Sequence, residues 1–387
     1  MDYLLNKNVK NIEISGIRKF FNMVADEKDV VSLTIGQPDF HTPDYVKNAA
    51  SEAIFKNKTT YTSNAGIIEL REAISKFNET NYGIRFDPLS EIIVTTGASQ
   101  AIDITFRTIL SPGDEVILPG PIYPGYEPLI TLAGAKTVYA DTTKTGFKLT
   151  KETLEQHITD KTKCVVLPYP SNPTGASFSR EELRELTEVL KGRDIFILAD
   201  EIYSELVFEN RHYSIASFDS IKDKTIVING LSKSHSMTGF RIGYVLAPKW
   251  LCKHILKVHQ YNVTCASSIS QYAALEALTN NSNSTRIMRE AYRKRRDYVY
   301  DRLKKMGLEV NNPEGAFYFF PKFPIREMSS FELGLALVRD AKVALVPGDS
   351  FSSLGEGYMR LSYAYDMDTI IQGLNRLETF LNNTTLR

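Results

Sequence analysis

The sequence predicts an α/β fold in which a large domain is built on a mostly parallel sheet and a smaller α+β domain is attached to it. Two observations favour this fold. In the middle of the chain, short β-branched apolar runs alternate with helix-like stretches, which is typical of strands joined by crossover helices. The chain has 387 residues, which is more than one compact core usually holds, so we expect a second domain.

Five apolar runs predict the strands of the large domain, at 92–96, 115–118, 164–167, 195–199 and 225–228. Their near-continuous apolarity indicates strands that are covered on both faces, as in a parallel sheet. Ligands of open α/β sheets bind beyond the carboxyl ends of the strands, so we expect one crevice lined by the polar residues that follow these runs. These residues are Ser99, Tyr123, Asn172, Asp200 and Lys233.

Two other patterns place helices and the second domain. Ser179 and Glu182 have the spacing of a capping box, which predicts that a helix begins there. After about residue 276 the pattern changes to a long charged helix and strand-like runs, at 286–306, 316–320 and 358–362.

The domain boundaries follow from this change of pattern. We expect a large domain over 41–276, which carries the crevice, and a smaller domain made of 277–387 with an amino-terminal arm, 1–40. The arm has no strand-helix repeat of its own, so we expect it to wrap onto the smaller domain or onto a neighbouring subunit.

Composition and missing motifs exclude several classes of function. The chain has 46 Lys plus Arg and 46 Asp plus Glu, so its charge gives no basic footprint for nucleic acid. The three cysteines lack the C-x-x-C spacing of zinc or redox sites, the histidines form no H-E-x-x-H pattern, and no apolar run is long enough to cross a membrane. We expect buried thiols, no metal site and a cytoplasmic protein that binds small molecules.

The glycine signatures of dinucleotide-binding, P-loop and hydrolase folds are also absent. Segment 95–100 instead begins a helix with small residues, whose free amides and helix dipole favour a phosphate. The composition of segment 171–175 is explained equally well by a simple turn.

Lys233 and Asp200 each allow two interpretations. A lysine amine attacks carbonyls only when it is unprotonated, which burial and a nearby cation such as Arg241 favour; the alternative is an ordinary solvated lysine. Asp200 ends an apolar run, so its carboxylate lies at the edge of a dry core and needs donors. The alternative for Asp200 is a cap of the following helical stretch.

Four separated motifs, taken together, resemble the class I pyridoxal-phosphate aminotransferases of fold type I. The motifs are 171–175, 200–203, 232–233 and 237–244, in this order and spacing, and the likeness extends from 35–40 to 360–362. The resemblance implies a homodimeric enzyme that uses pyridoxal 5'-phosphate to move an amino group between an L-amino acid and a 2-oxo acid.

Within this family, the sequence is similar to the group of N-acetyl-LL-diaminopimelate aminotransferases. The resemblance therefore implies N-acetyl-LL-2,6-diaminopimelate and 2-oxoglutarate as substrates, in lysine biosynthesis. Aspartate or aromatic amino acids stay open as substrates, because a family indicates a reaction better than a substrate. A β-eliminating C–S lyase and a non-catalytic ligand sensor on the same fold are further alternatives.

The resemblance also implies roles for residues around the cofactor ring. Lys233 would form the internal aldimine and move the proton, and Asp200 would pair with the pyridine nitrogen. Asn172 and Tyr203 would hydrogen-bond the ring 3-oxygen, and Tyr123 would stack on the ring.

The same resemblance implies a phosphate site and a substrate site. The phosphate would be held by Ala98, Ser99, Ser232, Arg241 and by Tyr61 from the second subunit of a dimer. Arg360 would bind the substrate α-carboxylate, because only a guanidinium offers a planar fork to it. The residues beside this carboxylate would be Gly36, Tyr123 and Asn172.

Two details of the sequence remain open. Many relatives have Trp before the phosphate-binding arginine, where this chain has Phe240, and we expect no change in chemistry from this exchange of aromatic rings. For the distal end of the substrate, Arg18 and Lys19 are candidates because their segment precedes the Gly36 loop; the alternative is that both are solvated charges.

Overall fold

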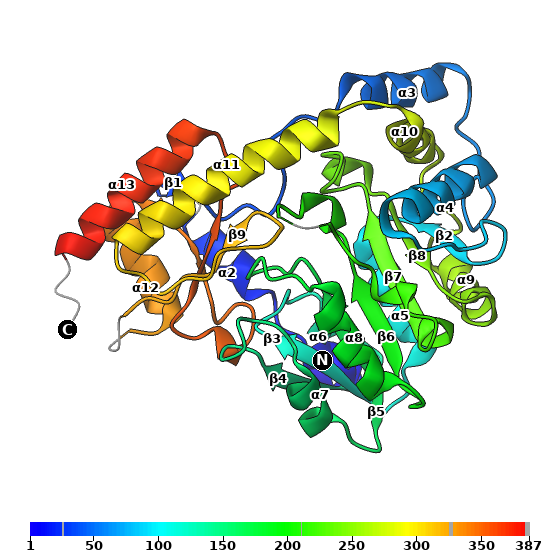
Figure 1. Cartoon of the computed structure of the whole chain (residues 1–387), viewed down its shortest axis with the longest axis horizontal. Helices are drawn as coiled ribbons and strands as arrows, with labels where there is room; N and C mark the ends of the chain where they lie inside the picture. Colours follow the sequence, from blue (N-terminus) through cyan, green and yellow to red (C-terminus); the bar gives the residue numbers. More distant parts are fainter. Residues whose placement is uncertain (25–26, 210, 325–327, 384–387) are drawn as a thin grey trace.

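A seven-stranded sheet lies at the centre of the computed structural model, which describes residues 1–24, 27–209, 211–324 and 328–383. The strand order is β2-β8-β7-β6-β5-β3-β4 (Figure 1). The strands are β2 (Ile92–Thr95), β3 (Glu115–Gly120), β4 (Lys136–Asp141), β5 (Thr162–Pro168), β6 (Phe196–Asp200), β7 (Thr225–Gly230) and β8 (Gly243–Leu246). Strand β8 is antiparallel to both its neighbours, and the other pairs are parallel. The predicted α/β fold with a mostly parallel sheet is confirmed, and β4 and β8 are additional to the five predicted strands.

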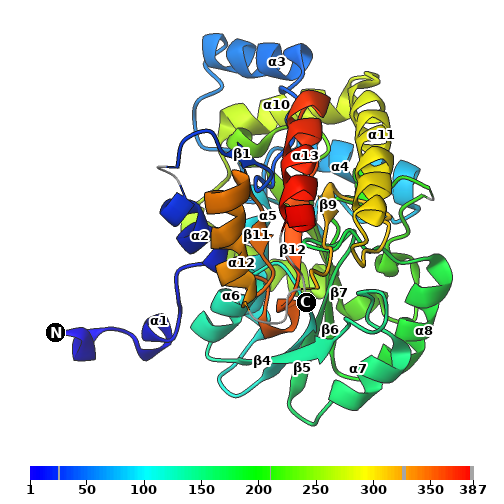
Figure 2. The same cartoon turned by 90° about the vertical axis from the view of Figure 1, so that its left-hand side faces the viewer.

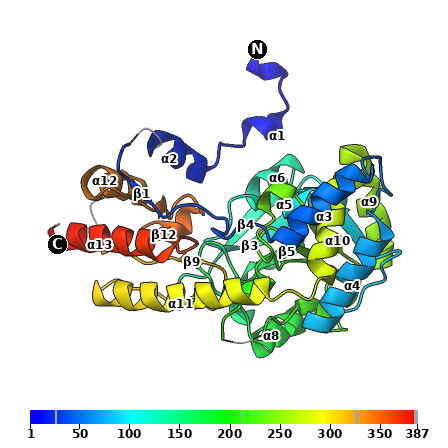
Figure 3. The ribbon, with the colours of Figure 1, turned by 90° about the horizontal axis from the view of Figure 1, so that it is seen from above.

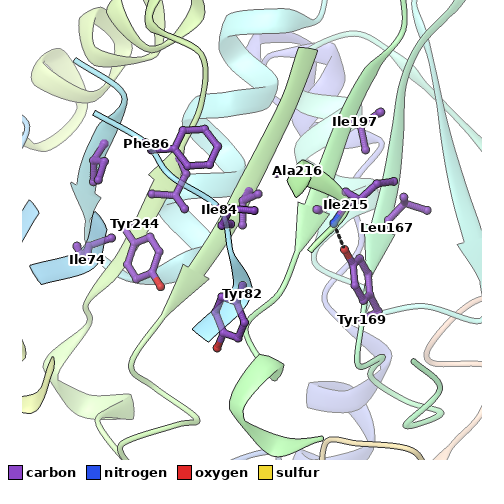
Figure 4. Packing of buried hydrophobic residues seen from close by; sticks show 14 of the residues in the cluster. Ile74, Tyr82, Ile84, Phe86, Leu167, Tyr169, Ile197, Ile215, Ala216 and Tyr244 are labelled. Carbon is purple, nitrogen blue, oxygen red and sulfur yellow. Dashed lines mark hydrogen bonds between the residues drawn. The ribbon is translucent and has the colours of Figure 1, made fainter. Parts of the chain in front are cut away.

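Helices cover both faces of this sheet. Their bounds are α3 (Asp44–Phe55), α4 (Ile68–Tyr82), α5 (Gly97–Ile109), α6 (Tyr126–Leu132), α7 (Lys151–His157), α8 (Arg180–Leu190), α9 (Lys249–Val263) and α10 (Ser268–Thr279). On β5, Val165 and Leu167 face a core shared with α4, α8 and α10, whereas Cys164 and Val166 face a core shared with α5 and α9. Figure 4 shows Leu167 within the first of these cores. This alternation explains why the strand sequences are apolar throughout.

A second group of elements lies at the other end of the molecule. It contains the antiparallel strands β9 (Tyr318–Phe319), β11 (Val346–Pro347) and β12 (Met359–Ser362), and the parallel pair β1 (Val31–Ser32) and β10 (Val343–Ala344). Its helices are α11 (Ser284–Lys305), α12 (Ser330–Ala336) and α13 (Met367–Asn383). Helix α11 runs from beside α10 to this second group (Figure 1). The domain boundaries proposed from the sequence stay a prediction.

The amino-terminal arm contains the short helices α1 (Lys7–Lys10) and α2 (Gly16–Val24). The start of the chain projects away from the rest of the molecule (Figure 3), whereas α1 contacts α6, where the Asn8 side-chain amide donates to the Leu132 carbonyl oxygen at 3.4 Å. Helix α2 instead lies beside α12 (Figure 2), where the rings of Phe20 and Phe331 meet edge to face with centroids 6.2 Å apart. The arm is therefore joined to the second group of elements by α2 and by the β1–β10 pair.

Shorter helical turns complete the described chain. Single 3-10 turns occur at Asp2–Leu4, Ser204–Leu206, Ile215–Ser217, Lys222–Lys224, Thr238–Phe240 and Ser353–Gly355, and a π turn at Leu337–Ala341. The predicted capping box is present: Ser179 Oγ accepts from the Glu182 amide at 3.2 Å, and the Glu182 carboxylate accepts from the Ser179 amide at 2.7 Å.

Two sequence expectations concern the cysteines and a membrane. Cys164 and Cys252 are buried, but Cys265 is only half-buried, so the expectation of three buried thiols is wrong for Cys265. Across the described ranges, none of the helices combines the length and the apolarity needed to cross a bilayer.

Candidate functional site

A cavity of about 880 Å³ opens where the carboxyl ends of the central strands face the second group of elements. Of the residues that the resemblance assigns to the cofactor and to the substrate α-carboxylate, all except Tyr61 line this cavity. They are Gly36, Ala98, Ser99, Tyr123, Asn172, Asp200, Tyr203, Ser232, Lys233, Arg241 and Arg360. The side chain of Tyr61 is 85% exposed and does not reach the cavity within one chain.

Lys233 follows β7 and points into this cavity. Its amine donates to the Gly36 carbonyl oxygen at 2.6 Å and lies 5.9 Å from the centroid of the Tyr203 ring. Burial, together with the nearby Arg360 and Arg241 charges, lowers the pKa of Lys233 to about 8 against the opposing effect of Asp200. The half-buried amine therefore carries a partial unprotonated population near neutral pH, which is the form that attacks carbonyls.

Asp200 ends β6 and is 6% exposed. The Tyr126 hydroxyl donates to Asp200 Oδ2 at 2.6 Å, and the Ile202 amide donates to Oδ1 at 3.2 Å. Burial raises the pKa of Asp200 to about 6, although both hydrogen bonds lower it. The chain after Asp200 forms only a 3-10 turn, so the carboxylate caps no α-helix and faces the cavity as a largely ionised group at neutral pH.

The start of helix α5 forms a cradle with Arg241. Gly97 has φ +77°, and a Cβ there would lie 2.4 Å from Arg241 Nη2, so the guanidinium rests against the helix start. A Cβ on Gly243 would lie 2.5 Å from the Ala98 amide nitrogen. Two glycines therefore leave room for a guanidinium beside free helix amides, an arrangement that favours a phosphate.

Arg360 lies on β12 and is 3% exposed. Its Nη1 donates to Asn172 Oδ1 at 2.9 Å and its Nη2 to the Thr34 carbonyl oxygen at 2.6 Å, while its buried Nε has no partner. Burial lowers the pKa of Arg360. No acidic side chain in the described part of the chain pairs with this cation, so the site lacks an anion that would balance it.

Two tyrosines that contact predicted site residues were not themselves predicted. Tyr318 on β9 hydrogen-bonds Tyr203 hydroxyl to hydroxyl at 2.8 Å, and its ring centroid lies 4.5 Å from the Arg360 guanidinium carbon. Tyr126 on α6 holds Asp200, as described above, and its ring meets that of Tyr123 edge to face. Each of these tyrosines lies close to other aromatic residues in the sequence. No sequence pattern indicates which of those rings faces the cavity.

These groups fit pyridoxal 5'-phosphate chemically. A half-buried amine suits an aldehyde, a buried carboxylate suits a protonated ring nitrogen, and the α5 start with Arg241 suits the phosphate. The unpartnered Nε of Arg360 leaves a donor for the carboxylate of an amino acid.

Comparisons with known proteins agree with this chemistry. The family model described as aminotransferase class I and II matches residues 28–377. The chain is 63% identical over 381 residues to the probable N-acetyl-LL-diaminopimelate aminotransferase of Bacillus subtilis (strain 168), covering 98% of this chain and 96% of that protein. It is 38% identical to the aromatic-amino-acid aminotransferase 2 of Thermococcus litoralis, covering 99% of both chains. The structure of the aspartate aminotransferase from Rhizobium meliloti superposes with a TM-score of 0.93 at 34% identity, covering 98% of both chains.

Proposed function

Because this chain belongs to the class I and II aminotransferases and depends on pyridoxal 5'-phosphate, we propose that it transfers the free amino group of N-acetyl-LL-2,6-diaminopimelate to 2-oxoglutarate. The observation that carries this choice of donor is the 63% identity to the Bacillus subtilis protein, against 34–38% for the aspartate and aromatic enzymes compared above. The reaction has two stages, in which the donor leaves as a 2-oxo acid before 2-oxoglutarate collects the nitrogen. This activity belongs to lysine biosynthesis in the cytoplasm.

When bound, pyridoxal 5'-phosphate supplies an aldehyde that takes up the amino nitrogen and a ring that accepts electrons from the substrate Cα. Lys233 Nζ removes the proton from this Cα and returns it during the exchange. Its lowered pKa matters because only the unprotonated amine accepts a proton. Asp200 keeps the ring nitrogen protonated, and Tyr126 holds the carboxylate that does so.

Arg360 and its neighbours orient the substrate. Its guanidinium binds the α-carboxylate, in contact with Asn172 and Tyr318 and beside Gly36. Both faces of β12 are buried, so the arginine is fixed by packing before a substrate binds. A fixed guanidinium positions the Cα proton toward Lys233 without a further loss of side-chain entropy.

The phosphate would be held by the α5 amides at Ala98 and Ser99 and by the side chains of Ser99, Ser232 and Arg241, which all line the cavity. Tyr203 and Asn172 would bind the ring 3-oxygen, and Tyr123 would stack on the ring. The proposal includes a homodimer with shared active sites, in which Tyr61 would reach the phosphate from a second copy of the chain. The exposed side chain of Tyr61, which lies outside the cavity of its own subunit, is compatible with this role.

A donor screen tests this function. With 2-oxoglutarate as acceptor, N-acetyl-LL-2,6-diaminopimelate, aspartate and phenylalanine are compared by the glutamate that each produces. We expect the highest kcat/KM for N-acetyl-LL-2,6-diaminopimelate. A higher kcat/KM for aspartate or phenylalanine overturns the proposed donor, and release of pyruvate and ammonia from cysteine conjugates without an acceptor would make the protein a C–S lyase.

A further inference from the structure

The orientation of helix α2 is fixed by packing on the second group of elements. Phe20 is buried against Val338 and Ala344, and Ile17 packs against a cluster that includes Phe351. These two contacts fix the side of α2 that faces the second group of elements. They thereby determine which of the other α2 side chains reach the cavity. The helix lies beside α12 at this place (Figures 2 and 3).

The neighbours Arg18 and Lys19 consequently lie in different surroundings. Arg18 lines the cavity together with Ile17 and Phe21, whereas Lys19 does not line it. Lys19 is turned away by about 100° along the helix and pairs with Glu13 at 2.5 Å. The structure therefore separates two cations that the sequence could not distinguish.

Among the described residues of the cavity wall, Arg18 is the one charged group that has no role in binding the cofactor or the substrate α-carboxylate. The charged side chains of this wall are Arg18, Asp200, Lys233, Arg241 and Arg360. Arg18 forms no ion pair or side-chain hydrogen bond with any residue that the structure describes, and it is exposed although it lines the cavity. An arginine in this position has all its donors available for an anion.

The cavity that Arg18 lines also has apolar side chains that suit the carbon chain of a substrate ending in a second carboxylate. Ile17, Phe21, Ile102 and Leu129 give the same cavity an apolar wall. Methylene groups pack on such a wall, and a distal carboxylate beyond them needs a cation or water. A neutral distal group would gain less from Arg18, because it would lack the charge that strengthens the hydrogen bond.

We propose that Arg18 binds the distal carboxylate of dicarboxylic substrates and selects them against neutral ones. For the donor, this inference rests on the proposed function, since N-acetyl-LL-2,6-diaminopimelate has a carboxylate at both ends. For glutamate and 2-oxoglutarate it holds whichever donor the enzyme uses. One arginine thereby serves both stages of the exchange, in which different dicarboxylates enter the same cavity.

The test compares glutamate with glutamine, which has a similar shape but a neutral distal amide. The conversion of the bound cofactor to its amine form is followed by absorbance for the holoenzyme, Arg18→Gln, Arg18→Lys and Lys19→Gln. We expect Arg18→Gln to lower kcat/KM for glutamate about 10-fold, a typical loss for a charge-assisted hydrogen bond, with little change for glutamine. Arg18→Lys retains part of the preference because it keeps the charge, and Lys19→Gln changes neither substrate.

Equal losses for glutamate and glutamine in Arg18→Gln would overturn the inference, because they would indicate a structural effect on α2. A loss in Lys19→Gln as large as that in Arg18→Gln would overturn it as well. The proposed donor and the role of Arg18 can be refuted separately. If the preference for glutamate depends on Arg18 but N-acetyl-LL-2,6-diaminopimelate is not turned over, only the proposed donor is refuted. Turnover of that donor with a preference that Arg18→Gln leaves unchanged refutes the role of Arg18 alone.

Discussion

Removing the Tyr126 hydroxyl should make cofactor binding more sensitive to acid. In Tyr126→Phe, Asp200 loses the hydrogen bond of 2.6 Å to its Oδ2 and keeps only the Ile202 amide at 3.2 Å. The lost bond stabilises the ionised carboxylate, so its removal favours the protonated acid. The pKa of Asp200 must therefore rise from its value of about 6.

The size of this rise follows from the strength of the hydrogen bond. A hydrogen bond to a charged group is worth about 1.5–3 kcal/mol, and one pKa unit corresponds to about 1.4 kcal/mol, so the pKa should increase to between about 7 and 8. Only the ionised carboxylate pairs with a protonated ring nitrogen. At low pH the variant should therefore bind pyridoxal 5'-phosphate about 10- to 100-fold more weakly than the parent protein, and the two affinities should converge above about pH 8.5.

The assay is a fluorescence titration of the apoprotein with pyridoxal 5'-phosphate between about pH 5 and pH 9. The ratio of the two dissociation constants is informative, because the titration of the cofactor and of Lys233 cancels in it. Tyr139→Phe is a matched control, since the Tyr139 hydroxyl donates to Glu127 at 2.9 Å outside the cavity. A ratio for Tyr126→Phe that stays constant across this pH range would refute the role assigned to Tyr126.

Three further substitutions test the other parts of the site. Lys233→Ala should reduce transamination from glutamate by at least about 100-fold in single-turnover absorbance, because no other amine lines the cavity within the described residues; full activity would exclude Lys233 as the proton carrier. Arg360→Lys should raise KM for glutamate about 10-fold in steady-state assays, since an ammonium lacks the planar fork; an unchanged KM would place the α-carboxylate elsewhere. Gly97→Ala should weaken pyridoxal 5'-phosphate binding in the same titration, because its Cβ would lie 2.4 Å from Arg241 Nη2. Gly192→Ala is the control, because it has the same backbone strain at φ +72° but no atom within 4 Å of the added Cβ. It should lower Tm without changing cofactor affinity. Equal losses of affinity in the two variants would contradict the role of Gly97 and Arg241 in holding the phosphate.

Local sequence patterns predicted much of the sheet and of the cavity. A buried parallel strand is apolar throughout and ends where polar residues begin, so Asp200 and Lys233 could be placed at one edge of the sheet. The short strand β8 could not be found in this way, because four residues inside a loop-like motif carry too little periodicity. Its antiparallel direction is set by its pairing with β2 and β7, which lies outside its own sequence.

Contacts between elements that are distant in the sequence could not be predicted from local sequence patterns. Tyr126 and Asp200 are 74 residues apart, and only the packing of α6 against the sheet brings them together. Tyr318 lies in an aromatic run without a polar–apolar alternation, and the fold alone directs its hydroxyl to Tyr203. Arg18 and Lys19 differ only in which side of α2 they occupy, which depends on where Phe20 is buried.

The central claim is that this chain transfers an amino group between two carbon skeletons, and nitrogen labelling tests it most directly. The holoenzyme is given N-acetyl-LL-2,6-diaminopimelate with an isotope label on its free amino nitrogen, together with unlabelled 2-oxoglutarate, and the products are analysed by mass spectrometry. The predicted result is glutamate that carries the label, in amounts equal to the 2-oxo acid formed from the donor. Label recovered as ammonia, or glutamate without label, would contradict the claim.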